Sequence, residues 1–337
     1  MPQPARVCST AQAAIVDAGD TGLGVECSAS IPLRRPMIPA LTALLLAAAT
    51  ATPADVPSDE TPIDCDACAD WNGDQAPFRI IGNTYYVGVH GVAAVLIKTR
   101  AGLILLDGGL PQSVPLIIAH IRALGFHVSD VRWILSSHAH FDHAGGIAAL
   151  QRISGANVAA STLAAPVLQT GLLPHDDPQY DAGKGRGFPP VAHVSPLLDG
   201  ESITLGEVTV TAHYTPGHTP GGVTWTWQSC GNLSCQDIVY ADSLNAAPSG
   251  NFRFDDPAHH PDPVRTLRHS IAVVRALRCD VVISVHPGFT DVFAKAAANS
   301  RDPTRNAFVD ATGCRAYADA ASAGLDAELK REATATP

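Results

Sequence analysis

The sequence lacks two features that would assign it to large classes of protein. It has no uninterrupted apolar run of about twenty residues, which is the length a membrane-spanning helix needs, since the apolar stretch at residues 38–48 is too short. It also has no dense stripe of Lys and Arg, and its formal net charge is −10. Binding to a phosphate backbone is therefore not expected. We expect neither a stable membrane anchor nor a nucleic-acid partner.

The first 51 residues are interpreted as a leader. Residues 33–51 carry, in order, a pair of arginines, a Leu/Ala-rich stretch and a group of small residues. This order is typical of a secretory signal peptide. We expect cleavage near Ala51 or Ala54, and Met37 is an alternative start. Export of this kind implies a periplasmic protein.

After the leader, the sequence predicts one α/β domain at residues 62–337. The segment 172–190 is rich in Gly, Pro and Asp and lacks apolar periodicity, so we expect a loop that borders a cleft. Two successive sets of strands and helices would bring their strand ends to one edge. Strands are expected at residues 79–89, 93–100, 102–106, 131–137 and 281–285 and in several runs between 202 and 240, and helices at residues 114–124, 147–153 and 264–277.

The most informative segment is His138-Ala-His-Phe-Asp-His143, in which four side chains can donate an electron pair to a metal. It follows an apolar strand and precedes a helix, and open α/β sheets place their sites at the carboxyl ends of strands. If the segment starts extended, His138 and His140 point to the same side. The chain must then turn and direct Asp142 and His143 to a second point nearby.

Two further histidines also follow strand-like runs. His218 lies in a Pro-Gly-His-Thr-Pro-Gly-Gly turn, and His286 precedes Pro-Gly. Imidazole and carboxylate donors together suit zinc. The remaining histidines are interpreted as ordinary surface or core residues, namely His90, His120, His127, His175, His193, His213, His259, His260 and His269.

These residues resemble the metallo-β-lactamase superfamily, from about residue 78 to about residue 286. The resemblance implies a four-layer αββα sandwich. Several short strings resemble subclass B3 of the β-lactamases in particular, and these are Trp71-Asn72, Ala76-Pro-Phe-Arg-Ile80, Leu106-Asp-Gly-Gly109, Tyr240-Ala-Asp-Ser-Leu244 and Ser284-Val-His-Pro-Gly288.

The resemblance implies two Zn²⁺ per chain, the first held by His138, His140 and His218 and the second by Asp142, His143 and His286. It further implies that a zinc-bound hydroxide opens the β-lactam ring of penicillins, cephalosporins and carbapenems, which confers antibiotic resistance. Asp142 is expected to orient that hydroxide and to carry a proton to the leaving nitrogen.

Three residues near these ligands are further candidates. Asp107 either fixes the tautomer of a ligand histidine or is a turn aspartate before two glycines. The resemblance points to Ser243 and Asn245 as contacts for the substrate carboxylate.

Two other functions remain open. Glyoxalase II-like thioesterases and lactonases of the same superfamily add a bridging aspartate, and Asp242 stands one residue from Ser243. Because neighbouring strand residues point to opposite faces, a slip of one residue decides whether Asp242 or Ser243 faces the metals. The surrounding string Tyr240-Ala-Asp-Ser-Leu244 favours Ser243 as the residue that faces them. A non-catalytic periplasmic zinc-binding protein would need a closed site, whereas three histidines favour an open position. A monomer is expected.

Six cysteines lie outside the leader, and an oxidising periplasm permits disulfides. Cys230 and Cys235 flank a Gly-Asn-Leu-Ser turn between strand-like runs, so they can close a hairpin. The last pair would join the final core strand to the C-terminal helices, as the family resemblance also suggests. For the first pair a local disulfide is expected, with a redox site or zinc knuckle as alternatives. The expected pairs are Cys65–Cys68, Cys230–Cys235 and Cys279–Cys314.

Overall fold

The computed structural model describes residues 61–334, apart from 181–186, 232–233 and 257–261. The expected leader at residues 1–51, with its signal peptide, lies outside the described residues. Across the described ranges, every helix is too short or too polar to span a lipid bilayer.

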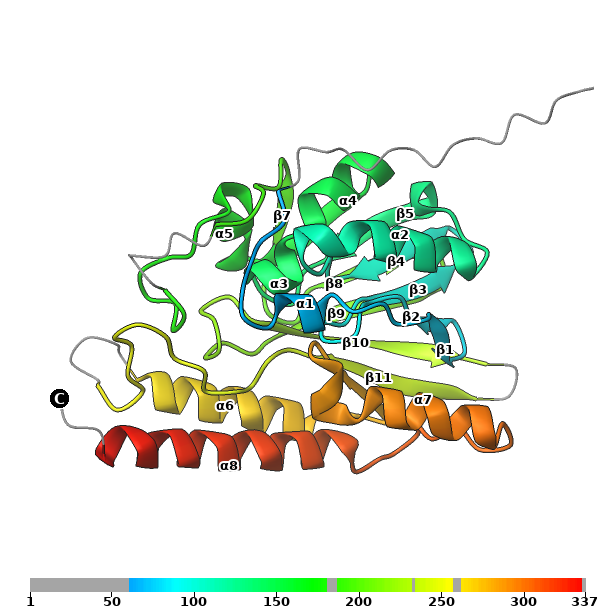
Figure 1. Cartoon of the computed structure of the whole chain (residues 1–337). Coiled ribbons are helices and arrows are strands. Elements are labelled where there is room, and N and C mark those ends of the chain that lie inside the picture. Colours follow the sequence, from blue (N-terminus) through cyan, green and yellow to red (C-terminus); the bar gives the residue numbers. More distant parts are fainter. Residues whose placement is uncertain (1–60, 181–186, 232–233, 257–261, 335–337) are drawn as a thin grey trace, which may run out of the picture. The chain divides into compact units, whose positions relative to one another are not determined.

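Two β-sheets lie face to face at the centre of the described part of the chain (Figure 1). The first sheet runs in the order β1 to β7, with strands Phe78–Ile81, Thr84–Tyr86, Val95–Thr99, Gly102–Leu106, Val131–Leu135, Asn157–Ser161 and Val194–Leu197. The second runs β12-β11-β10-β9-β8, with strands Val281–Ser284, Cys235–Ala241, Val223–Cys230, Val208–Tyr214 and Ser202–Leu205. Neighbours β4 to β7 are parallel, as are β11 and β12.

Helices cover the outer faces of both sheets, so the expected α/β fold with an αββα sandwich is confirmed (Figure 1). The first sheet carries α2 (Val114–Ala123), α4 (Ile147–Ser154) and α5 (Ala164–Thr170). The second carries α6 (Pro263–Ala276) and α8 (Gly313–Thr334), while α7 (Val292–Arg301) contributes Val292 to the core between the sheets.

Strand side chains that alternate between two faces explain why the strands read as continuous apolar runs. In β4, Leu105 packs beneath the first helical layer, while its neighbour Ile104 packs between the sheets. In β11, Tyr240 lies between the sheets and Val239 packs against α6 and α8. A strand that is buried on both faces needs an apolar residue at every position.

One expected element differs from the structure. Residues 79–89 were expected to form a single strand, but they contain the end of β1, a turn and all of β2, which pair as an antiparallel hairpin. The turn contains Gly82 with a φ of 50°, a left-handed conformation that glycine adopts without steric cost. The apolar run continues through the turn, so hydrophobicity alone does not reveal the reversal.

Parallel strands direct their carboxyl ends to the same edge of a sheet. In the first sheet, β4 ends before Asp107 and β5 ends before the segment with His138. In the second, the parallel strands β11 and β12 end before Asp242 and His286. The loops that leave these strand ends carry the side chains of the candidate site.

The structure contains three disulfides, Cys65–Cys68, Cys230–Cys235 and Cys279–Cys314. Cys230 and Cys235 are directly opposed partners at the end of the β10–β11 hairpin. The third disulfide joins the segment before β12 to α8 across 35 residues of chain. The helical layer behind the second sheet is therefore covalently attached to a core strand.

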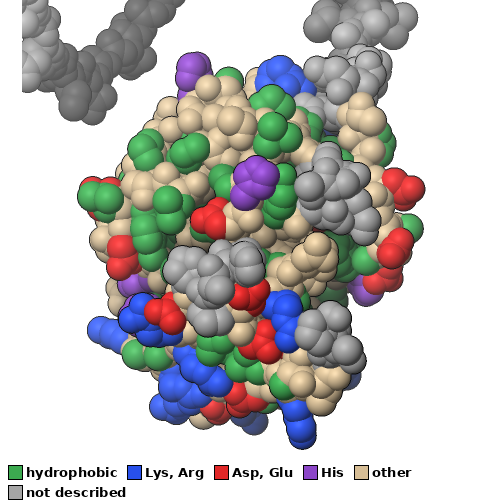
Figure 2. Space-filling view, turned by 90° about the vertical axis from the view of Figure 1, so that its left-hand side faces the viewer, with side chains coloured by type: hydrophobic (Ala, Val, Ile, Leu, Met, Phe, Trp, Pro, Cys, Tyr) green, Lys and Arg blue, Asp and Glu red, His purple; other side chains and the backbone are tan. Residues whose placement is uncertain are grey.

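Arginines of the second helical layer pair with acidic residues rather than forming a basic surface. Arg268 and Arg275 on α6 contact Asp326 and Asp319 on α8. In the face shown in Figure 2, Lys and Arg side chains lie mostly in the lower part, where they alternate with Asp and Glu. These pairs are exposed to solvent, so each contributes little to stability.

We predict unequal contributions from two of the disulfides. Loss of the pair that closes 35 residues, by Cys279→Ala with Cys314→Ala, should lower the free energy of unfolding by about 4 kcal/mol on a chain-entropy estimate. The matched loss of the pair that closes 5 residues should cost about 2 kcal/mol. Urea unfolding measures both, and a larger loss from Cys230→Ala with Cys235→Ala would contradict the estimate.

Candidate metal centre

Four of the expected donors come from the loop after β5 and the short helix α3 (Phe141–Ala144). The backbone is extended at His140, with a φ of −87° and a ψ of 153°, and becomes helical at the next residue. The rings of His138 and His140 lie on the same side, with centroids 4.9 Å apart. The change from extended to helical backbone directs Asp142 and His143 to a neighbouring position.

A first donor group consists of His138, His140 and His218, which are buried and offer ligand atoms within 4.8 Å of one another. In each ring, one nitrogen has a hydrogen-bond partner, which leaves the other available for a metal. Histidines that bind a metal usually donate their second N–H to a carboxylate or carbonyl in this way. The partnered atoms are His138 Nδ1 with Asp242 Oδ1 at 2.7 Å, His140 Nε2 with Asp177 Oδ1 at 3.0 Å, and His218 Nδ1 with the carbonyl of Asn245 at 3.0 Å.

A second donor group consists of Asp142, His143 and His286. The distance from Asp142 Oδ2 is 3.1 Å to His143 Nε2 and 3.5 Å to His286 Nε2, and the two nitrogens are 3.3 Å apart. His286 Nδ1 lies 3.0 Å from the carbonyl of Gly91, so this nitrogen is the ring's donor and Nε2 is free. Gly91 is required there, because a Cβ would come within 2.2 Å of the Trp71 ring.

Zinc fits both groups. With ligand bonds of about 2.0–2.1 Å and tetrahedral angles, two ligand atoms lie about 3.4 Å apart, and the second group shows separations of 3.1–3.5 Å. In the first group, His138 Nε2 is buried without a hydrogen-bond partner among the described residues. A buried polar atom of this kind is costly unless something binds it. Three imidazoles with an open side are typical of a catalytic rather than a structural zinc site.

The pKa shifts favour neutral rings at His218 and His286, whereas the pKa of His143 is raised, because the adjacent Asp142 and Asp107 outweigh the opposing effect of burial. Burial, together with the neighbouring His140, lowers the pKa of His218 to about 3, and burial beside His143 lowers that of His286 to about 4. Burial disfavours the charge of Asp142, but the adjacent His143 and His286 lower its pKa well below that of a free carboxyl. Neutral imidazole and ionised carboxylate are the forms that bind metals.

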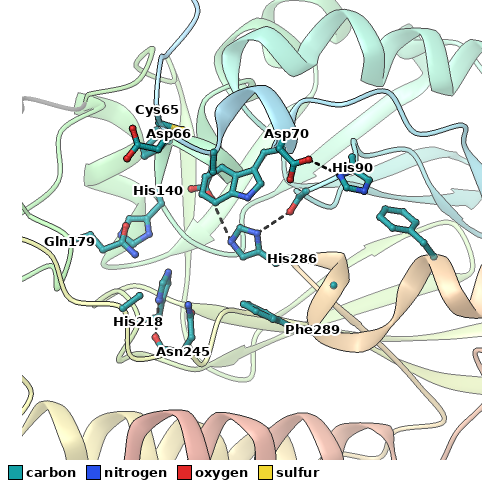
Figure 3. Close-up of a pocket in the computed structure, with 18 residues that line it drawn as sticks. Cys65, Asp66, Asp70, His90, His140, Gln179, His218, Asn245, His286 and Phe289 are labelled. Atoms are coloured by element: carbon teal, nitrogen blue, oxygen red, sulfur yellow. Dashed lines mark hydrogen bonds and ion pairs between the residues drawn. The ribbon is translucent and has the colours of Figure 1, made fainter. Parts of the chain in front are cut away.

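Both donor groups border one open cavity of about 590 Å³ (Figure 3). His140, His218 and His286 point into it, with Gln179 and Asn245 on one side and Phe289 on another. Among the described residues that line it, none is Lys or Arg.

Three other residues were expected at the site, and only one of them, Asn245, lines the cavity. Ser243 is fully buried and is not part of the cavity lining, and its hydroxyl oxygen has no hydrogen-bond partner among the described residues. Asp107 Oδ2 lies 3.9 Å from His143 Nδ1, beyond hydrogen-bond distance. Its carboxylate instead accepts bonds from the Ser137 N–H and hydroxyl, both at 2.7 Å, and from the Tyr240 hydroxyl at 2.8 Å. Control of a histidine tautomer by Asp107 stays a prediction.

Asp242 contacts the side of His138 that faces away from the other donors. Its Oδ1 lies 2.7 Å from His138 Nδ1, and both side chains are fully buried. Burial raises the pKa of Asp242 and lowers that of His138, so it disfavours charge on both members of the pair. In this arrangement Asp242 orients the ring and does not bridge the two donor groups.

Sequence reasoning missed Asp177, Gln179 and Trp71 as parts of the site and assigned His90 to the ordinary histidines. Asp177 and Gln179 lie in the segment that was expected to border the cleft, but nothing in its composition distinguishes them from their neighbours. Trp71 packs on His286 with ring centroids 5.4 Å apart, and His90 lines the same cavity. Only the folded chain brings these segments together.

We predict that the metal-free protein loses stability in acid. The pKa values of His218 and His286 are lowered from 6.5 in the unfolded chain to about 3 and about 4, so the unfolded state binds more protons. Their contribution is present above pH 6.5 and lost below it, by about 2 kcal/mol each at pH 5. The raised pKa of His143 acts in the opposite direction and offsets part of this loss. Urea unfolding of chelator-treated protein at pH 7 and pH 5 measures this.

The matched variants are His286→Ala, which should reduce the pH dependence, and His269→Ala at an exposed position, which should not. Equal stability of the metal-free protein at both pH values would disprove the prediction.

Comparison with curated proteins shows partial matches to hydrolases of related fold. The chain is 32% identical over 184 residues to a hydroxyacylglutathione hydrolase from Anaeromyxobacter dehalogenans, covering 55% of each protein. It is 27% identical over 157 residues to an N-acyl homoserine lactonase from Bacillus cereus, covering 36% of this chain and 63% of that protein. The chain thus spans about half to two thirds of the length of these curated relatives.

Comparison with solved structures gives matches over nearly the whole partner. The Rm3 metallo-beta-lactamase is 48% identical with a TM-score of 0.78, covering 81% of this chain and 100% of that one. MEM-A1, a subclass B3 metallo-beta-lactamase from a soil metagenome library, is 48% identical with a TM-score of 0.76, covering 78% and 99%. The metallo-beta-lactamase SMB-1, solved with mercaptoacetic acid, is 44% identical with a TM-score of 0.74, also covering 78% and 99%.

The family model of the metallo-beta-lactamase superfamily matches residues 87–286, which is more than half of the chain and includes every donor of the two groups. With this match and subclass B3 enzymes among its structural neighbours, the chain belongs to the metallo-beta-lactamase superfamily.

Proposed function

We propose that this protein is a zinc-dependent hydrolase that opens the amide of β-lactam antibiotics. The observation that carries the proposal is the presence of two adjacent donor groups on one open cavity, in a chain whose structural neighbours include subclass B3 metallo-beta-lactamases. His138, His140 and His218 would hold one Zn²⁺, and Asp142, His143 and His286 a second. Bound zinc supplies a water with a pKa of about 7 and polarises a carbonyl oxygen.

Asp142 is the proposed catalytic residue. Its Oδ2 faces the Nε2 atoms of His143 and His286, which leaves Oδ1 to accept a hydrogen bond from the attacking water and so to orient it. Because its pKa is low, Asp142 starts as a carboxylate that can receive the proton of that water. It can then pass the proton to the nitrogen released when the C–N bond breaks.

Asn245 is the proposed contact for the substrate carboxylate. It lines the cavity beside His218, and its backbone carbonyl already accepts the bond from His218 Nδ1, so the residue is fixed relative to the first donor group (Figure 3). Its amide N–H₂ group is a donor for an anionic ligand. Ser243 would reach such a ligand only after its side chain turned out of the interior, so Asn245 is the stronger candidate of the pair.

A thioesterase or lactonase is the second candidate function, since curated relatives carry the names hydroxyacylglutathione hydrolase and N-acyl homoserine lactonase. The position of Asp242 argues against it. Its carboxylate contacts His138 Nδ1 and does not reach between the donor groups, whereas the related thioesterases and lactonases are expected to use a bridging aspartate. We further propose that the protein is a periplasmic monomer. The disulfides in the structure agree with an oxidising compartment such as the periplasm.

We predict the order of substrate preference. Zinc-loaded protein should hydrolyse a chromogenic cephalosporin and a carbapenem at least a hundredfold faster, in kcat/KM, than S-lactoylglutathione or a homoserine lactone. A chelator should abolish the turnover and added zinc should restore it, while clavulanate should have no effect because no serine is acylated. The reverse ranking of substrates would replace the β-lactamase proposal with the thioesterase or lactonase alternative.

We predict that one substitution separates the two metal sites. The wild-type protein should bind two zinc ions per chain, measured by elemental analysis after dialysis, and His286→Ala should bind one because only the second group loses a donor. Turnover should fall at least tenfold in that variant. The control His269→Ala changes an exposed histidine and should keep both ions. Two tightly bound ions in His286→Ala would show that His286 is not a ligand.

A further inference from the structure

We propose that Asp177 is a positioning residue that couples the first donor group to the wall of the substrate cavity. The inference rests on the proposed zinc centre and extends it to the segment of residues 174–180. According to this proposal, zinc binding to the first donor group and ordering of residues 174–180 are thermodynamically coupled.

The Asp177 carboxylate connects a donor histidine directly to the cavity wall. Its Oδ1 atom lies 3.0 Å from His140 Nε2 and 2.8 Å from the backbone N–H of Gln179, so one oxygen accepts from both. Asp177 is 2% exposed although it lies on a surface loop. Gln179 lines the cavity next to His140 (Figure 3). A shift of the carboxylate therefore moves a ring and a wall residue together.

The backbone around Asp177 adds rigidity to this connection. The Asp177 N–H donates to the carbonyl of Pro174 at 3.1 Å, and the Tyr180 N–H donates to the carbonyl of Asp177 at 2.9 Å. The two prolines of the segment, Pro174 and Pro178, also restrict its backbone. The segment is thus a compact turn centred on the carboxylate.

A second wall segment makes the equivalent connection to His218. The carbonyl of Asn245 accepts from His218 Nδ1 at 3.0 Å, and the Asn245 side chain lines the cavity. The two wall segments are joined, because the Ser249 N–H donates to the carbonyl of Pro178 at 2.9 Å. The partners that orient His140 and His218 therefore lie in two mutually bonded loops that also form the wall for the substrate.

This arrangement makes the coupling reciprocal. A metal ion bound between His140 and His218 fixes both rings and, through their N–H donors, the Asp177 carboxylate and the Asn245 carbonyl. By linkage, the free energy by which bound metal stabilises the ordered loops equals the free energy by which the ordered loops strengthen metal binding. A buried aspartate that only stabilised its own turn would not produce this dependence.

The test compares Asp177→Ala, Asp177→Asn and the matched control Asp176→Ala, which changes the neighbouring, exposed aspartate. Zinc affinity is measured by competition with a chromophoric chelator, in the absence of any β-lactam. Loss of a partner that orients a ligand histidine typically weakens metal affinity 10–100-fold, so Asp177→Ala should lose that factor for one of two ions. Asp177→Asn keeps an oxygen acceptor and should lose less than tenfold, and Asp176→Ala less than twofold.

Hydrogen exchange supplies the second readout. Addition of zinc to metal-free wild type should slow exchange of the Gln179 and Tyr180 amides at least tenfold. The same protection should appear in Asp176→Ala and Asp177→Asn and be absent in Asp177→Ala. Zinc affinity of Asp177→Ala within twofold of wild type, or equal exchange with and without zinc in wild type, would overturn the proposal. The wild-type arm decides the matter even if Asp177→Ala does not fold.

The outcome is separable from that of the proposed function. A protein that binds two zinc ions with protection of the loop but opens no β-lactam would refute the proposed reaction and keep the coupling. A protein that opens β-lactams while Asp177→Ala keeps wild-type zinc affinity would do the reverse.

Discussion

The convergence of buried imidazoles is the constraint on which the rest of the structure depends. His138, His140, His143, His218 and His286 bring their rings to centroid distances of 4.4–5.0 Å from one another in successive pairs. Protonated rings would repel at this distance, and neutral rings leave lone pairs directed at one another without donors. A divalent cation resolves both problems, because it binds the lone pairs and balances the ionised Asp142. The stability of the site and its chemistry therefore have the same origin.

The side of each ring that faces away from the cavity is as constrained as the side that faces it. Asp242, Asp177 and the carbonyls of Asn245 and Gly91 each accept from a different histidine, and they come from three separate segments. Each partner fixes the tautomer of its ring, which decides the nitrogen that is left for a metal. The two sheets and their helical layers hold these three segments in place, and the segments in turn fix the donor rings. All three segments also contribute residues to the cavity wall.

The comparison with relatives separates what the fold shares from what this chain adds. A hydroxyacylglutathione hydrolase and a lactonase match about half to two thirds of their length, and the metallo-beta-lactamase structures match nearly in full. The range matched by the family model, residues 87–286, contains the strand ends and the donors. The segments outside that range, which include the N-terminal turn with Trp71 and the Cys65–Cys68 disulfide, build the cavity wall above His286.

Local patterns in the sequence were enough to identify the donor cluster and the strands and helices of an α/β domain, whereas the four-layer order was implied by the family resemblance. Short spacing puts His138, His140, Asp142 and His143 within one turn of chain, and apolar runs buried on both faces identify the central strands. The sequence did not reveal the hairpin turn at Gly82, since hydrophobicity continues through it. It did not decide whether Asp242 or Ser243 faces the donors, because strand alternation places the two side chains on opposite faces without showing which face is nearer the donors. Only the tertiary structure decided that Ser243 is buried, that Asp242 orients His138, and that Asp177 reaches His140 from 37 residues away. Contacts between distant segments depend on how the sheets and loops pack, and no local pattern encodes that packing.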